Sequence, residues 1–169
     1  MFLIKNICLI MFSIIFILFT VGYASQPIIV SNNNALSLLD FNSIKHTYSD
    51  NNYNSIIDNV NLAYTSVYYS CILISILLGL GIIFVLFKYY IFKVTGNILF
   101  LISLIYMIVV FIVLQLLIIL NSFVTSFDQS SDSKSIQFNI QTSNGPGYYL
   151  MLVSTILMII THIVYTIFA

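Results

Sequence analysis

The stretch VYYSCILISILLGLGIIFVLF, residues 67–87, decides the fold. It contains no Asp, Glu, Lys or Arg. At about 1.5 Å per residue, a helix of this length covers roughly 31 Å, which matches the hydrocarbon core of a bilayer. Three other stretches share this character, at residues 7–24, 98–120 and 148–168. The sequence therefore predicts four transmembrane helices at approximately 7–24, 67–87, 98–120 and 148–168.

The composition supports one membrane domain over residues 1–169. Of these residues, 60% are hydrophobic and only 6% are charged, and the formal net charge is zero. A soluble domain of this size would need many more charged side chains on its surface. Five basic residues without a net positive charge also argue against a nucleic-acid partner. The lipid bilayer is the partner that we expect.

The lysines indicate an orientation. Three of them lie close to helix ends on one side, at Lys5, Lys88 and Lys93. Because lysine near the end of a span favours the cytoplasmic side, the link 88–97 and both termini are predicted to be cytoplasmic. The two long loops, 25–66 and 121–147, are then extracellular or luminal, in the plasma membrane or an endomembrane.

The first apolar stretch has two interpretations. Lys5, the apolar run and Gly22-Tyr23-Ala24 also resemble a signal peptide that ends at a cleavage site. We favour a retained helix because the apolar run is long for a signal peptide. Cleavage would leave the other three helices in the same orientation.

The outer loops are predicted to form a small β-sheet. Apolar residues alternate with polar ones at Ile136, Phe138 and Ile140, as in a half-buried strand. A lone strand is unstable in water, so the first loop is expected to supply a hairpin from residues 27–41. Residues 144–147, Asn-Gly-Pro-Gly, are predicted to turn the chain sharply into the last helix, because Gly permits positive φ and Pro fixes the bend. The predicted fold class is an all-α membrane protein, a four-helix transmembrane bundle with a small extracytoplasmic sheet made by both outer loops.

This layout resembles the claudin-like superfamily of four-helix membrane proteins, which includes the peripheral-myelin-protein and eisosome-type branches. The shared features are a larger first outer loop, a strand in the second loop and the entry Gly147-Tyr148-Tyr149-Leu150 to the last helix. The chain has no Trp, and it lacks the paired first-loop cysteines of that group. The resemblance therefore implies an architecture and assigns no functional residue.

Small residues form a candidate helix-packing stripe on the second helix. Cys71, Ser75 and Gly79 recur at every fourth position, and Gly81 is expected to widen the same face. Small side chains let membrane helices approach closely. Two alternatives remain open, packing inside the bundle and packing against another protein.

Polar side chains within the predicted helices are the candidate intramembrane sites. His162 is expected at the same depth as Ser103 and Tyr106, where it would form a hydrogen bond between helices or take part in a proton or ion relay. The structural role is favoured because no carboxylate lies in these helices. Gln115 is expected to bond a neighbouring helix at another depth.

Signs of catalytic chemistry are absent from the sequence. Nucleophile-elbow, zinc-protease and phosphate-loop motifs do not occur, so no enzyme, cofactor or metal site is expected. His46 with Asp40 and Asp50 makes a poor metal cluster. Cys8 and Cys71 are predicted to lie near opposite ends of their helices, too far apart for a disulfide.

Three functional hypotheses follow. The first is a claudin-like protein that acts through interactions, in membrane organisation, adhesion or as an accessory subunit of a homo- or hetero-oligomer. The second is a small channel or transporter subunit with His162 on the path. The third is a structural subunit of a larger membrane complex.

Overall fold

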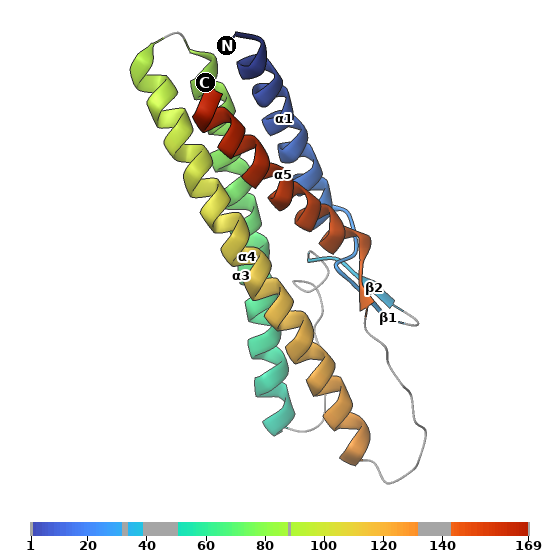
Figure 1. Ribbon diagram of the computed structural model, residues 1–169. Coiled ribbons are helices and arrows are strands. Elements are labelled where there is room, and N and C mark those ends of the chain that lie inside the picture. The colour runs from blue at the N-terminus through green and yellow to red at the C-terminus, as the bar shows by residue number, and fades with distance from the viewer. Residues whose placement is uncertain (1, 32–33, 39–50, 88, 132–142, 169) are drawn as a thin grey trace.

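A computed structural model describes residues 2–31, 34–38, 51–87, 89–131 and 143–168 of the chain (Figure 1). Long helices dominate the described residues, and three short strands lie at one side. In chain order the elements are α1 (Phe2–Ala24), β1 (Ile29–Ser31), β2 (Asn34–Leu36), α3 (Asn51–Leu86), α4 (Tyr90–Ser131), β3 (Ser143–Asn144) and α5 (Pro146–Phe168).

Within the described part of the chain, four helices are long and apolar enough to cross a membrane. Their apolar spans are Leu3–Ala24, Leu62–Leu86, Tyr90–Ile119 and Pro146–Phe168. The prediction of four membrane-crossing helices is confirmed at this level. Both chain termini and the α3–α4 link lie at one end of the bundle (Figure 1). We call this the terminal end.

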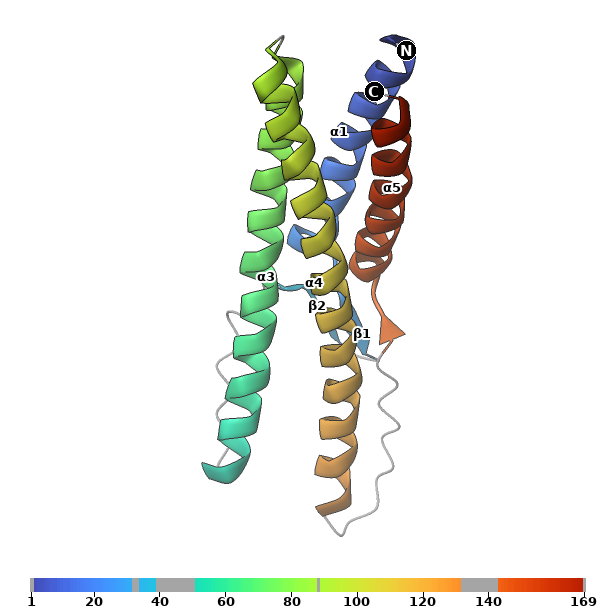
Figure 2. The ribbon, with the colours of Figure 1, turned by 60° about the vertical axis from the view of Figure 1, so that its left-hand side comes forward.

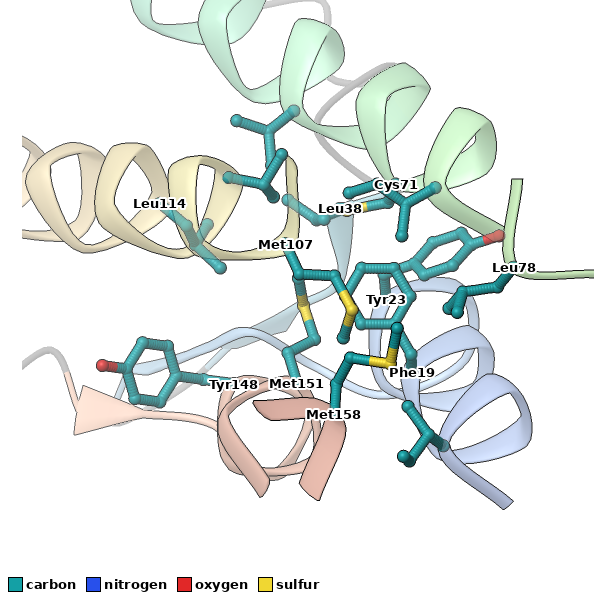
Figure 3. Packing of buried hydrophobic residues seen from close by; sticks show 14 of the residues in the cluster. Phe19, Tyr23, Leu38, Cys71, Leu78, Met107, Leu114, Tyr148, Met151 and Met158 are labelled. Carbon is teal, nitrogen blue, oxygen red and sulfur yellow. The ribbon is translucent and has the colours of Figure 1, made fainter. Parts of the chain in front are cut away.

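The bundle is built from two helix pairs. α1 packs mainly against α5, and α3 packs mainly against α4. Side chains from all four helices meet in the core, where Met107, Met151 and Met158 fill the centre (Figure 3). Methionine suits such a site because its flexible thioether adapts to irregular gaps. Leu38, which follows β2, is also fully buried and closes the core on the side of the strands.

The described strands form one small antiparallel sheet in the order β2-β1-β3. β1 pairs with β2 from the same loop, with Ile29 opposite Leu36, and with β3 from the second loop, with Ile29 opposite Asn144. The predicted strand at 136–141 lies outside the described residues. The strand that joins the sheet from the second loop is instead the two-residue β3, directly before α5.

The start of α5 is fixed by the first loop. The amide of Gly145 donates to the carbonyl of Ile28 at 2.7 Å, and that of Gly147 donates to the carbonyl of Pro27 at 2.9 Å. These bonds occupy N–H groups that have no partner inside a helix. No described glycine adopts positive φ, so the turn does not use that freedom of glycine. Glycine is required here by contact: a Cβ on Gly145 would lie 2.2 Å from the Pro27 carbonyl oxygen.

α3 and α4 are longer than the predicted helices. α3 begins at Asn51 and α4 runs from Tyr90 to Ser131, so parts of the predicted loops 25–66, 88–97 and 121–147 are helical. The prediction used apolar stretches alone, and these end where the side chains become polar. Neither helical addition outside the apolar spans contains Pro or Gly, so nothing local stops the helix there.

We call residues 51–61 and 120–131 the α3–α4 extension. At about 1.5 Å per residue, these segments add roughly 16 and 18 Å to the two helices. They pass beyond the sheet and beyond the ends of α1 and α5, at the end of the molecule opposite the termini (Figure 2).

α3 and α4 meet closely at two glycines. A Cβ on Gly81 would lie 2.7 Å from the ring of Phe100, and a Cβ on Gly96 would lie 3.0 Å from the carbonyl oxygen of Gly81. A Cβ on Gly79 would meet only Phe16 of α1, at 3.8 Å. Gly81 therefore belongs to the α4-facing side of α3, and it does not widen the stripe that includes Gly79.

This contrast predicts opposite effects of the same substitution two residues apart. Gly81→Ala should lower the free energy of unfolding by about 1–3 kcal/mol, because the new methyl group overlaps a fully buried ring. Gly79→Ala should be neutral or should stabilise by up to about 1 kcal/mol through helix propensity. Thermal unfolding of both variants in the same detergent measures the difference, and equal melting temperatures would contradict the described crossing.

Candidate functional site

The small-residue stripe of α3 packs inside the bundle. Cys71 is fully buried, Ser75 is 8% exposed, and Gly79 faces Phe16 of α1. The printed contacts of Ser75 and Gly79 are with α1 of the same chain.

A small polar cluster joins α1 and α3 at this stripe. Ser75 Oγ donates to Tyr23 Oη at 3.2 Å, and Thr20 Oγ1 lies 3.4 Å from Ser75 Oγ. Thr20 also donates to the carbonyl of Phe16 in its own helix. All three groups are neutral hydroxyls, so the cluster can hold two helices in register but has no strong base to move a proton. Sequence reasoning identified Ser75 and missed Thr20 and Tyr23, because nothing in either helix alone shows which faces meet.

Gln115 is bonded to the start of α5. Tyr148 Oη donates to Gln115 Oε1 at 2.5 Å, and the Tyr148 ring packs against Phe111 of α4 at 5.1 Å between centroids. Tyr148 is buried, with 7% of its surface exposed. The pair therefore links α4 to the same helix terminus that the first loop fixes.

Tyr148→Phe should remove this bond while keeping the ring packing. Interhelical hydrogen bonds in membrane proteins contribute about 0.6 kcal/mol on average and up to about 1.7, so we expect a loss within that range. Tyr149→Phe is the matched control, because Tyr149 is 54% exposed and should tolerate the change. A further Gln115→Leu change should recover most of the loss, since it removes the acceptor left without a donor. Urea or thermal titration in detergent measures these differences.

The residues expected around His162 do not converge on it. Ser103 Oγ donates to the carbonyl of Leu99 in its own helix at 2.8 Å, and Tyr106 is 45% exposed, on the outer surface of α4. His162 Nδ1 is enclosed without a hydrogen-bond partner, and its backbone carbonyl accepts a bond from Thr166. The structure therefore places His162, Ser103 and Tyr106 in three different environments, and it does not assemble them into a relay.

Metal and thiol chemistry have little support among the residues described. No group of three or more His, Cys, Asp or Glu in those ranges could hold a metal ion. Cys8 and Cys71 are both buried free thiols, on α1 and α3. His46, Asp40 and Asp50 lie outside the described residues.

The distinctive features are therefore the joint between the first loop and α5 and the long α3–α4 extension. Neither was predicted: the joint depends on a contact between distant parts of the chain, and the extension is polar. Comparisons with protein-family models, curated proteins and solved structures find no match to this chain.

Proposed function

We propose that the chain is a claudin-like integral membrane protein that acts by binding other proteins through its α3–α4 extension. Both termini lie in the cytoplasm in this proposal, and the extension and the sheet lie on the extracellular or luminal side. The observation that carries it is the continuation of two paired helices beyond their apolar spans. Adhesion, membrane organisation and a role as an accessory subunit are all forms of this activity.

The dimensions of the helices support a projection from the bilayer. α1 and α5 have 23 residues each, whereas α3 has 36 and α4 has 42. At about 1.5 Å per residue, these lengths correspond to roughly 35, 54 and 63 Å, against a hydrocarbon core of about 30 Å. Only α3 and α4 are thus long enough to reach well past the headgroups.

The claudin-like resemblance and the retained first helix are parts of the same proposal. Pairing of β1 with β3 joins the two long loops, which supports this proposal. α1 supplies Phe12, Ile15 and Phe19 to the buried core, so a chain cleaved after residue 24 would lack one side of the bundle. We therefore include α1 in the mature protein.

Labelling of single cysteines tests the orientation. Ser25→Cys and Tyr89→Cys place exposed thiols at opposite ends of the bundle, while the two native cysteines are buried. In sealed vesicles with the cytoplasmic face outward, an impermeant maleimide should label Tyr89→Cys at once and Ser25→Cys only after detergent is added. The reverse pattern would contradict the orientation.

Shortening the extension tests the interaction. Deleting 52–58 and 122–128 removes about two turns from each helix and leaves the apolar spans intact. Chemical cross-linking in the native membrane, followed by sizing in mild detergent, should show a larger assembly for the full chain and loss of it for the shortened chain. A full-length chain that stays a monomer without cross-linked partners would refute the proposal, provided that the labelling experiment confirms its insertion.

A further inference from the structure

A pocket opens at the terminal end of the bundle, far from the α3–α4 extension. It has a volume of about 400 Å³ and lies between the first turns of α1, the first turns of α4 and the last turn of α5. Lys5 of α1, Lys93 and Asn97 of α4 and Tyr165 of α5 are among its lining residues. Tyr165 packs against Phe12 and Phe100, which gives this wall a rigid aromatic support.

The charge in this pocket is positive and has no acidic counterpart nearby in the sequence. Lys5 and Lys93 line the same pocket, so their like charges repel each other. All five acidic residues lie between positions 40 and 58 or at 128 and 132. Of these, Asp58 and Asp128 belong to the extension, at the opposite end of the bundle. Two half-buried ammonium groups that share a pocket are expected to attract an anion.

Two further features suit a phosphate group with a hydroxyl beside it. α4 begins at Tyr90, which lines the pocket, so the positive end of a long helix dipole adds to the lysine charges. Asn97 lines the pocket too, and its Oδ1 is enclosed without a hydrogen-bond partner. A ligand hydroxyl can satisfy an amide in either orientation, because it both donates and accepts.

The height of the pocket identifies the source of such a ligand. Its lining residues lie in the end turns of three membrane-crossing helices, at the level of the lipid headgroups. Basic pockets between transmembrane helices at this level are typical headgroup sites. We propose that the pocket binds the headgroup of an anionic phospholipid that carries a hydroxyl, such as phosphatidylinositol. Lys5 and Lys93 contact the phosphate, and Asn97 contacts the hydroxyl.

Lipid retention by the full chain in nanodiscs tests this site. The chain is placed in phosphatidylcholine discs that contain an increasing small share of phosphatidylinositol. The phosphatidylinositol molecules retained by the chain are counted by native mass spectrometry. The Lys5→Gln/Lys93→Gln variant should bind phosphatidylinositol about 10- to 30-fold more weakly, since each lysine near the surface contributes about a tenfold effect or less. Lys134→Gln, in the chain between α4 and β3, removes a lysine charge that does not line the pocket and should bind as the unaltered chain does.

Four other results would change the assignment of this pocket or of Asn97. Equal weakening by the pocket variant and by Lys134→Gln would overturn the site, because it would show only an effect of overall charge. Unchanged retention in the pocket variant would overturn it as well. Soluble inositol phosphate, added to the chain in neutral discs, should raise its melting temperature less than phosphatidylinositol does. An equal rise would overturn the lipid assignment. Asn97→Leu should lower the preference for phosphatidylinositol over phosphatidic acid and leave phosphatidic acid binding unchanged; an unaltered preference would remove the role of Asn97.

The pocket variants are suited to this test because Lys5 and Lys93 are only half-buried. Their melting temperatures in neutral discs should equal that of the unaltered chain, which separates loss of binding from loss of folding. If the double variant unfolds, Lys93→Gln alone is compared with Lys93→Arg, which keeps the charge. Weaker lipid binding by Lys93→Gln together with normal lipid binding by Lys93→Arg supports the site. Equally weak lipid binding by these two variants overturns it.

Discussion

Gly147→Ala should be one of the most destabilising single-methyl additions in this chain. A Cβ at this position would lie 2.5 Å from the carbonyl oxygen of Gly22 and 2.8 Å from that of Gln26. Both contacts are with backbone atoms, which cannot rotate away as a flexible side chain can. We expect the free energy of unfolding to fall by about 2–3 kcal/mol, toward the upper end of the usual overpacking cost.

The expected fall in melting temperature is roughly 5–10 °C, from about 2–4 °C per kcal/mol for a chain of this size. Differential scanning fluorimetry in detergent measures it, with Gly79→Ala as the matched control. The loss should appear together with easier proteolysis of the first loop, because Gly147 also bonds Pro27. A melting temperature equal to that of Gly79→Ala would show that α1 and α5 are not in contact at this point.

Phe100→Ala should have the largest effect of any substitution considered. Phe100 is fully buried, stacks on Phe12 with 4.0 Å between ring centroids, and meets Tyr165 edge-on at 6.1 Å. This cluster joins α1, α4 and α5. Truncation of a buried phenylalanine to alanine leaves a cavity and costs about 3–5 kcal/mol. Phe168→Ala is the control, because Phe168 is 48% exposed and its truncation should change stability little.

A double-substitution cycle makes this prediction specific. Gly81→Ala should destabilise the unaltered chain but be tolerated in the Phe100→Ala background, where the ring that it overlaps is gone. The next atom that a Cβ on Gly81 would meet is the carbonyl oxygen of Gly96 at 3.5 Å, an ordinary contact. Strict additivity of the two losses would contradict the close approach of Gly81 and Phe100.

The membrane-crossing segments could be predicted from sequence because one property identifies them. Apolar runs free of charged residues are a local signal, and each is long enough for a bilayer. The α3–α4 extension gave no such signal. Ile56, Ile57 and Val60, which the structure places within α3, lie among polar residues and form no apolar run. Polar sequence without Pro or Gly permits a continued helix but does not require one.

The packing contacts were predictable only in part. The stripe of Cys71, Ser75 and Gly79 was visible as a repeat, but its partner helix was not. Gly81 and Gly96 lie at similar distances on either side of the α3–α4 link, so an antiparallel pair brings them opposite each other. That spacing is a signal which could have identified their contact. The joint of Gly22 with Gly147 has no comparable signal, because it is aligned by bonds between Pro27 and Ile28 and the distant Gly145 and Gly147.

The pairing of α1 with α5 determines when the molecule can be completed during its synthesis. The ribosome makes α1 first and α5 last, so the surface of α1 that carries Gly22 enters the membrane long before its neighbour exists. Until then, the carbonyls of Pro27 and Ile28 also lack the amides that they will bind. A nascent chain that stops before residue 143 thus lacks β3 and the amides of Gly145 and Gly147, so its first loop stays unfinished.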